Sequence, residues 1–313
     1  MKYSLTLKFL RFTPPLEKFL VFFVAVTCGL GSPLWAAEGE GQSTVTIESP
    51  NKNKVEKAEE IDQEITNNAL RAGSGSTSKW SVANSLNYNG GSIEKPLAED
   101  RPNISEGSGT ITKALMSGQV SVKRTLDMRN SLFAGVGVRW IAPLSKDGPR
   151  NYNGDRMDVD NPYLTYQYLY KWLGVQSVFQ ISPTYVSNIN LKRDGYVGNI
   201  SFSQDNMIEV ANTGLWVGCY TYIFGANFDK STPDVLSNQA DYGFGFSPEI
   251  EFQITPKVNL RTVSNFWLFE HLRSFSSGDT YNRLKSTQSV GVGFSVTRDV
   301  FIYPNVQFLP DDM

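Results

Sequence analysis

The residues best suited to catalysis lie in the sequence FWLFEHLRS, which contains His271, the single histidine of the chain. It follows Glu270 and precedes Ser274 by three positions. A histidine next to a carboxylate can activate a serine hydroxyl, as lipid-cleaving hydrolases do. No G-x-S-x-G or H-E-x-x-H motif accompanies it, and one histidine is too few for a histidine-based metal site. We interpret His271 as an exposed histidine at the base of a loop, and we predict no catalytic site, cofactor or metal.

Two further groups of residues are weaker candidates for a chemical role. Asp155, Asp158 and Asp160 offer oxygen ligands for a hard cation, but their sequence lacks the central glycine and terminal glutamate of a calcium loop. We therefore interpret them as a solvated acidic loop. The only cysteines are Cys28 and Cys219, which cannot form a metal cluster, and Cys219 is predicted to be an inert buried thiol.

An alternation of apolar and small or polar residues runs along most of the chain. Between Tyr242 and Ile254 the even positions are apolar or proline, whereas the odd positions are Gly, Ser, Glu and Gln. Successive side chains of a strand point to opposite faces, so one face of each strand is apolar and the other is polar. Eleven strands are predicted, near residues 77–90, 110–126, 130–142, 161–172, 175–187, 197–209, 214–228, 240–255, 258–272, 284–298 and 300–309.

The lengths of the strands and connections favour a membrane barrel. The strands have about 11 to 15 residues, enough for a tilted membrane crossing of roughly 9 to 11. Short turns alternate with longer polar loops, as in outer-membrane barrels, where the short turns face the periplasm. The segments DYGFGFSPEIEFQITPKVNL and STQSVGVGFSVTRDVFIYPNVQF resemble proteobacterial outer-membrane barrel proteins of the uncharacterised, porin-like kind. The resemblance covers residues 77–310 and implies an antiparallel transmembrane β-barrel of about 12 strands.

The end of the chain departs from this family pattern. The last strand of such proteins usually ends in an aromatic residue, whereas this chain ends in Leu-Pro-Asp-Asp-Met. Bacterial single-chain barrels have an even number of strands, so eleven strands leave one missing. Either the closing strand is absent from this chain, or residues 43–48 (STVTIE) supply it.

In a barrel, the parity of each strand predicts which charged side chains face the lumen. If Pro256 centres a tight turn, Glu251 lies opposite Arg261 across the hairpin. The predicted lumen-facing charges are Lys123, Arg139, Glu249, Glu251 and Arg261. Paired charges of this kind either brace a narrow lumen or line a pore and set its ion preference.

Aromatic residues recur at alternate positions of two predicted strands. We assign Tyr166, Tyr168, Tyr170 and Trp172 to the membrane interface, where amphipathic rings lie at headgroup level. Tyr220, Tyr222 and Phe224 have the same spacing and suggest the same role. A lane inside the lumen that stacks on sugars or nucleosides is the alternative for these aromatic sets.

The N-terminal part has a different composition. Residues 1–36 combine basic residues, an apolar run of about 12 residues and small residues at 36 and 37, the pattern of a cleaved signal peptide. Residues 37–76 form a polar periplasmic segment, in which apolar spacing predicts one amphipathic helix over 54–72. We interpret it as a partly ordered periplasmic helix; the alternatives are that it plugs the lumen or binds a neighbour. Residues 77–313 form the barrel. Removal of 1–36 takes away four cations and one anion and lowers the net charge from −2 to −5, which disfavours a nucleic-acid partner.

We therefore expect a non-enzymatic protein of the bacterial outer membrane that contacts lipid. The leading function is passive, porin-like passage of small hydrophilic solutes, or a purely structural barrel. Binding or adhesion through the long extracellular loops is the alternative. A lipid hydrolase that uses His271 and Ser274 is the weakest of these hypotheses.

Overall fold

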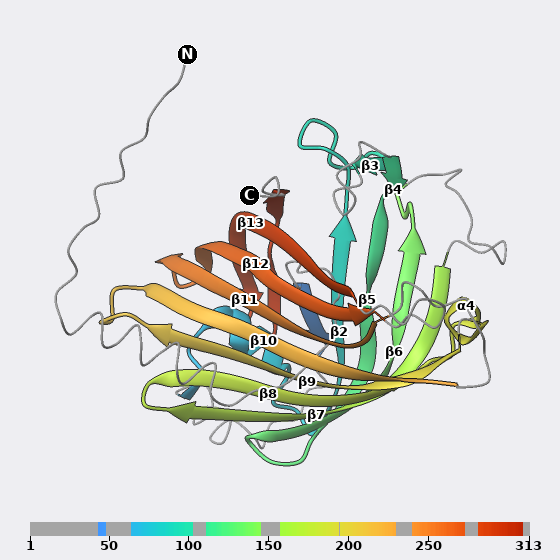
Figure 1. Cartoon of the computed structure of the whole chain (residues 1–313). Coiled ribbons are helices and arrows are strands. Elements are labelled where there is room, and N and C mark those ends of the chain that lie inside the picture. The colour runs from blue at the N-terminus through green and yellow to red at the C-terminus, as the bar shows by residue number, and fades with distance from the viewer. Residues whose placement is uncertain are drawn as a thin grey trace. The chain divides into compact units, whose positions relative to one another are not determined.

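The computed structural model describes residues 43–47, 64–102, 111–144, 157–193, 195–229, 240–272 and 281–308. The chain divides into residues 1–31 and 32–313, and every described residue belongs to the second unit. Most of that unit is one large antiparallel sheet (Figure 1). No described helix is long and apolar enough to cross a membrane.

The sheet has 13 strands in the order β12-β11-β10-β9-β8-β7-β6-β5-β2-β1-β14-β13-β15, and β12 also pairs with β13. From β5 to β13, strands that follow one another in sequence are neighbours in the sheet, as in an antiparallel meander. The strands are β1 Ser43–Ile47, β2 Trp80–Asn89, β5 Leu115–Thr125, β6 Asn130–Ile141, β7 Met157–Trp172, β8 Val175–Tyr185, β9 Tyr196–Glu209, β10 Leu215–Phe228, β11 Ala240–Thr255, β12 Val258–Leu272, β13 Tyr281–Thr297, β14 Val300–Ile302 and β15 Asn305–Phe308.

Each of the eleven predicted strands is present, with three differences. A small separate hairpin, β3 Asp100–Pro102 with β4 Ile111–Lys113, precedes β5. Strand β7 begins at Met157, so Asp158 and Asp160 are strand residues and the predicted acidic loop is wrong for both. Asp155 lies outside the described residues. The last predicted strand is interrupted at residues 303–304. Pro304 has no backbone N–H and cannot donate to the ladder, so β14 and β15 pair in succession with β13.

The short turns all lie at one end of the sheet, which we call the short-turn end. They connect β5 to β6, β7 to β8, β9 to β10, β11 to β12 and β13 to β14. In the two-residue β7–β8 turn, Leu173 and Gly174 both have positive φ, 49° and 86°, as the commonest hairpin turn requires. The opposite, long-loop end includes the short helix α4 (Ile189–Arg193).

Strand β1 occupies the segment that the sequence offered as a twelfth strand. It is antiparallel to β2, with Ser43 opposite Leu86 and Ile47 opposite Val82. Its other edge pairs with β14 through Thr44 and Phe301. Ile47 and Trp80 both lie at the short-turn end, so the connection from β1 to β2 starts and finishes there.

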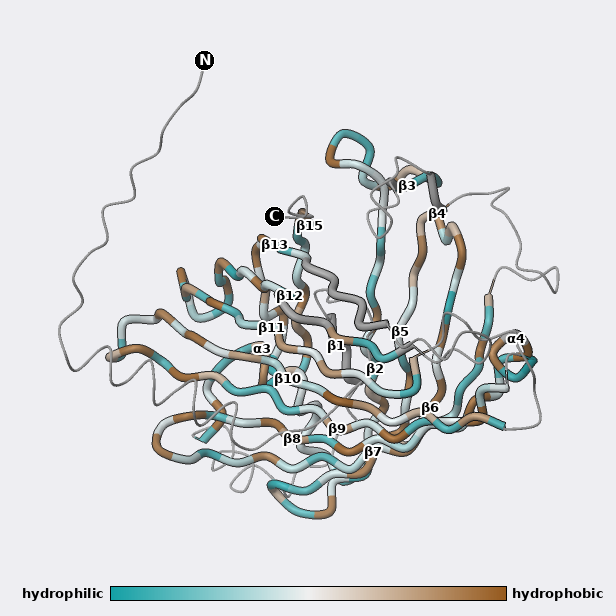
Figure 2. The backbone as a smooth tube through the Cα atoms, in the orientation of Figure 1, coloured by the Kyte–Doolittle hydropathy of each residue, from teal (hydrophilic) through white to brown (hydrophobic). Residues whose placement is uncertain are grey.

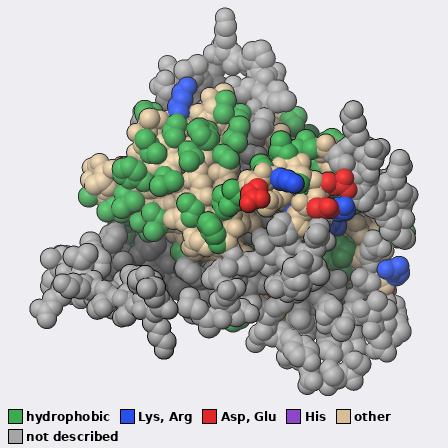
Figure 3. Space-filling view, turned by 90° about the horizontal axis from the view of Figure 1, so that it is seen from above, with side chains coloured by type: hydrophobic (Ala, Val, Ile, Leu, Met, Phe, Trp, Pro, Cys, Tyr) green, Lys and Arg blue, Asp and Glu red, His purple; other side chains and the backbone are tan. Residues whose placement is uncertain are grey.

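The two faces of the sheet have the reverse of the usual polarity of a water-soluble protein. In β11, Ile250, Phe252 and Ile254 are 47, 48 and 58 % exposed, whereas Glu249 and Glu251 are 3 and 0 % exposed. In β13, Val290, Phe294 and Val296 are exposed while Ser289 and Ser295 are buried. The alternation of hydropathy along the strands is visible in Figure 2, and Figure 3 shows hydrophobic side chains gathered over a broad area with few charges. The apolar face therefore points outward and the polar face inward.

The predicted helix over 54–72 is not continuous. Residues 48–63 lie outside the described residues, 65–67 are not helical, and α3 spans Asn68–Ser74. Asn67 is extended and its side chain accepts a hydrogen bond from the Leu70 N–H (3.0 Å), so it begins a new helix. Gly75, with φ 73°, ends the helix.

Candidate functional site

Residues 64–76, which we call the inner segment, lie against the polar face of the sheet. The side chain of Gln176 in β8 binds the start of the segment: its Oε1 accepts from the Thr66 and Asn67 N–H groups (2.9 and 3.0 Å). Its Nε2 donates to the Thr66 hydroxyl (2.8 Å). The buried Asn67 side chain donates to Glu251 of β11 (2.9 Å). These bonds satisfy the backbone where the predicted helix is broken.

Apolar contacts hold the same segment on both sides. Buried Ile65 and Leu70 belong to a cluster with four inward side chains of β7 to β10, namely Leu169, Val178, Met207 and Trp216. Ala72 packs instead on Phe301 and Tyr303, near β14. These inward apolar residues form one patch on a mainly polar face of the sheet, and the inner segment covers them.

Cations bind the end of the inner segment. Lys123 of β5 is 3 % exposed, and its Nζ donates to the carbonyl oxygens of Ser74 (2.6 Å) and Ser76 (2.8 Å). Arg298, in the β13–β14 turn, donates to the Gly75 carbonyl (3.0 Å). The last carbonyls of a helix carry partial negative charge, which cations stabilise. An acidic side chain therefore binds the start of the segment and basic side chains bind its end.

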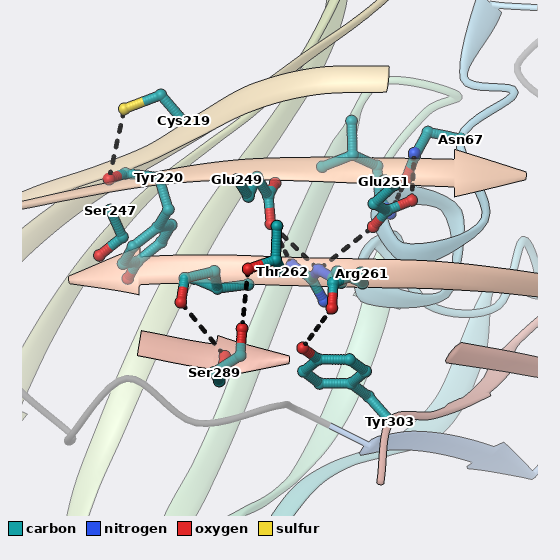
Figure 4. Close-up of polar contacts among 12 residues, drawn as sticks. Asn67, Cys219, Tyr220, Ser247, Glu249, Glu251, Arg261, Thr262, Ser289 and Tyr303 are labelled. Carbon is teal, nitrogen blue, oxygen red and sulfur yellow. Dashed lines mark hydrogen bonds and ion pairs between the residues drawn. The ribbon is translucent and has the colours of Figure 1, made fainter. Parts of the chain in front are cut away.

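A buried charged cluster links the inner segment to β11 and β12 (Figure 4). Arg261 Nε lies 3.1 Å from Glu249 and 3.2 Å from Glu251, in the predicted cross-strand register. Its guanidinium also lies 5.3 Å from the centre of the Tyr303 ring. Asn259 donates to the same Glu251 oxygen as Asn67 does (2.9 Å). Asp205 of β9 adds a third carboxylate that interacts electrostatically with Arg261.

Tyr222 and Phe224 do not lie on the exposed face, so the interface assignment is wrong for them. Both rings are buried, and they lie over Gly245 and Gly243 of the neighbouring strand. A Cβ at Gly245 would come within 1.8 Å of the Tyr222 ring, so only glycine leaves room for it. The rings therefore pack against the polar face of the sheet, and their burial does not support an open stacking lane. Tyr220 shares the parity of Tyr222 and Phe224 and packs against them.

The predicted aromatic residues of β7 lie on the opposite face. In β7 the buried residues are Thr165, Gln167 and Leu169, so the intervening tyrosines point outward. The outward set comprises half-buried Tyr166, Tyr168 and Tyr170 and exposed Trp172. Arg139 shares the inward parity of Gly135 and Gly137 but is exposed and takes no part in the charged cluster.

His271 is a strand residue rather than an exposed loop residue. Its Nδ1 lies 2.5 Å from Asp241, and its ring stacks on Tyr242 at 4.4 Å. Ser274, the proposed nucleophile, lies outside the described residues. Within the described ranges, no group of three or more His, Cys, Asp or Glu side chains is placed to hold a metal ion.

Comparison with family models, curated proteins and solved structures gives no match to this chain. The geometry of the site is therefore the basis for a functional assignment.

The sequence predicts the charges of this site, but it leaves open whether the N-terminal helix lies against them. Lys123, Glu249, Glu251 and Arg261 were selected by strand parity, and the structure brings all four to the inner face. For the inner segment the sequence predicts a helix that is either periplasmic or plugs the lumen, and it does not predict which residues of the sheet the segment contacts. Leu169, Val178, Met207 and Trp216 were the available signal, because apolar residues on a polar face require a cover.

Proposed function

We propose that this protein is an outer-membrane β-barrel, exported by a signal in residues 1–36, that admits small hydrophilic solutes when its inner segment is displaced. The inverted polarity of the sheet carries this proposal. Exposed Ile250, Phe252 and Ile254 need an apolar surrounding, and buried Glu249 and Glu251 need a polar interior. A lipid bilayer outside and a polar lumen inside meet both needs.

The strand pairings support closure of the sheet into a barrel. β12 pairs with both β11 and β13, and β1 pairs with both β2 and β14. β14 and β15 follow one another along the same edge of β13, so they count as one interrupted strand. The 13 strands then make 12 wall positions, an even number as in bacterial barrels. Closure also removes unpaired strand edges, which have no partner in a bilayer.

The position of the inner segment supports a lumen that is closed at rest. It bonds to β5, β7, β8 and β11 and packs near β14, so its partners are spread around the whole wall. It belongs to the connection between β1 and β2, and the strand ends that flank this connection, Ile47 and Trp80, lie at the short-turn end. Passage of solutes therefore requires the segment to move.

Heat-modifiable migration tests the proposal. The full-length protein, expressed in a Gram-negative host, should remain in the outer-membrane fraction after a urea wash. It should also migrate faster on a gel without boiling than after boiling, because a closed barrel resists detergent. Recovery as a soluble periplasmic monomer, without detergent, would refute the proposed membrane location.

Deletion of residues 43–47 tests closure by β1. The deletion leaves the edges of β2 and β14 unpaired, so the fast-migrating form should be lost or should unfold at a lower temperature. The matched control deletes residues 38–42, which shortens the chain equally and keeps β1. Unchanged migration of the 43–47 variant would show that β1 does not close the barrel.

A further inference from the structure

The buried charged cluster of β9, β11 and β12 contains more negative than positive groups. It holds three carboxyl groups, those of Asp205, Glu249 and Glu251, around the single guanidinium of Arg261. Both glutamates are buried, so water does not offset the difference. An ionised carboxylate loses its hydration in such a place, and like charges close together cannot all remain ionised. The cluster therefore needs either a second cation or a proton.

The strands packed around the cluster supply no second cation among the described residues. Tyr220 of β10 and Tyr303 after β14 are the titratable groups that face it from those elements. Strands β8 and β13 place Val178 and Gly291 beside it, and neither residue titrates. A balancing charge from the wall itself is therefore not available.

The charged side chains of the inner segment and of its binding residues are engaged elsewhere. Glu64 pairs with an arginine of the β5–β6 turn (2.6 Å), and Arg71 donates to a side chain of its own helix (2.7 Å). Lys123 and Arg298 bind the far end of the segment and have their own acidic partner. Asp299 forms an ion pair with Arg298 and interacts electrostatically with Lys123. A proton is therefore the remaining means of offsetting the negative charge of the cluster.

Asp205 and Glu249 are placed to share that proton. Their carboxyl groups lie within hydrogen-bonding reach of each other. Two ionised carboxylates only accept hydrogen bonds, so a bond between them requires a proton on one of them. The Oδ1 atom of Asp205 is buried and has no hydrogen-bond partner in the described part of the chain. A full negative charge on Asp205 would therefore be poorly compensated.

The inner segment covers this cluster. Asn67 donates to Glu251 (2.9 Å), and Figure 4 shows its side chain pointing to that carboxylate beside Arg261. Displacement of the segment removes this donor and admits water to the cluster. In water each carboxyl group ionises in its ordinary range, so at neutral pH the displaced state holds fewer protons than the covered state.

We propose that the charged cluster is a proton-dependent latch on the inner segment, closed while Asp205 and Glu249 share a proton and released when that proton passes to water. The consequence for solutes rests on the proposed function, because release of the segment is what opens the lumen. A proton that is bound in the closed state and lost in the open state stabilises the closed state at acid and neutral pH, and this stabilisation disappears as the pH rises. For each proton released, the ratio of open to closed molecules rises by up to about tenfold per pH unit.

The mobility of a spin label on the inner segment tests the latch. Gly73→Cys in a Cys219→Ser background carries the nitroxide, because position 73 is exposed and a Cβ there meets no atom within 4 Å. The mobile fraction of the label should rise between about pH 5 and about pH 9, which lie between the ordinary ranges of carboxyl groups and of tyrosine and lysine. A mobile fraction that does not change with pH would overturn the proposal.

Substitutions assign the pH dependence to the cluster. Asp205→Asn keeps the shape and removes a titrating group, so the rise of the mobile fraction should be at least halved. If that variant does not fold, Glu249→Gln provides the second test. Asp100→Asn is the matched control, because this exposed residue pairs with Lys113 in the separate β3–β4 hairpin, and it should behave as the wild type does. An unreduced rise in the Asp205 or Glu249 variant would overturn the assignment.

Planar-bilayer recordings over the same pH range separate the latch from the proposed function. If the label becomes mobile at high pH and no current steps appear, the latch is supported and solute passage is contradicted. If current steps appear and the mobility of the label does not depend on pH, solute passage is supported and the latch is overturned.

Discussion

Replacement of Arg261 by methionine is expected to lower the free energy of unfolding by about 3–5 kcal/mol. Its guanidinium is the only cation that the described contacts give to Glu249 and Glu251, and its side chain is 14 % exposed. Methionine keeps much of the side-chain volume but leaves these buried carboxylates and Asp205 without a counter-charge. Urea-induced unfolding of the purified protein in detergent measures the change.

Two further variants show whether the cause is unpaired charge. Arg261→Met combined with Glu249→Gln and Glu251→Gln should recover part of the loss, because neutral amides cost less to bury than unpaired carboxylates. Arg193→Met, at an exposed position of α4, should change the free energy of unfolding by less than about 0.5 kcal/mol. If the single Arg261 variant has the same free energy of unfolding as the wild type, the charged cluster is solvated and does not stabilise the fold.

Replacement of residues 64–76 by a glycine- and serine-rich sequence of equal length is expected to open the lumen. The new sequence lacks the Asn67 side chain that binds Glu251 and the apolar side chains that pack in the cluster. The bonds to Gln176, Lys123 and Arg298 involve mainly backbone groups, which the new sequence keeps. Loss of Ile65 and Leu70 alone removes about 1.5–3 kcal/mol of burial each. In a planar lipid bilayer, the wild type should show rare or no current steps and the variant frequent ones.

The control for this experiment replaces residues 93–97, which are exposed at the long-loop end, with the same kind of sequence. This control variant should give the same frequency of current steps as the wild type. If the replacement of 64–76 prevents assembly, Ile65→Asp with Leu70→Asp offers a milder way to expel the segment. A variant that assembles but stays silent would favour the structural barrel, or binding through the long loops, over solute passage.

The strands were predictable because each one follows the same local pattern, an alternation of apolar and polar residues. The alternation around Ile250 and Val290 is strict, and turn residues such as Leu173-Gly174 mark the ends. The register of the β11–β12 hairpin followed from Pro256 alone, and the Glu251–Arg261 pairing confirms it. The break at Pro304 was predictable in principle, because proline cannot donate to the ladder. The early start of β7 was not, because it depends on pairing with β6.

The sequence predicts a helix in this region and leaves open that it plugs the lumen, but the fold and contacts of the inner segment could not be predicted, for a related reason. Its fold depends on contacts such as Asn67 with Glu251 and Thr66 with Gln176, which are separated by more than 100 residues. The spacing of Ile65 and Leu70 fits one helix, but Asn67 begins a new one because Gln176 takes up the backbone N–H groups before it. The position of Tyr222 likewise depends on Gly245 in the next strand, and spacing alone does not reveal it.

The central claim, that the apolar face of the sheet contacts hydrocarbon, is tested most directly by a nitroxide scan of β11 in lipid vesicles. Single cysteines in a Cys219→Ser background carry the spin label at Phe246, Ile250 and Phe252 on one face, and at Ser247 and Gln253 on the other. We predict strong collision with lipid-dissolved oxygen at the three even positions and weak collision at the two odd ones. Equal or reversed accessibility would contradict a lipid-facing apolar surface.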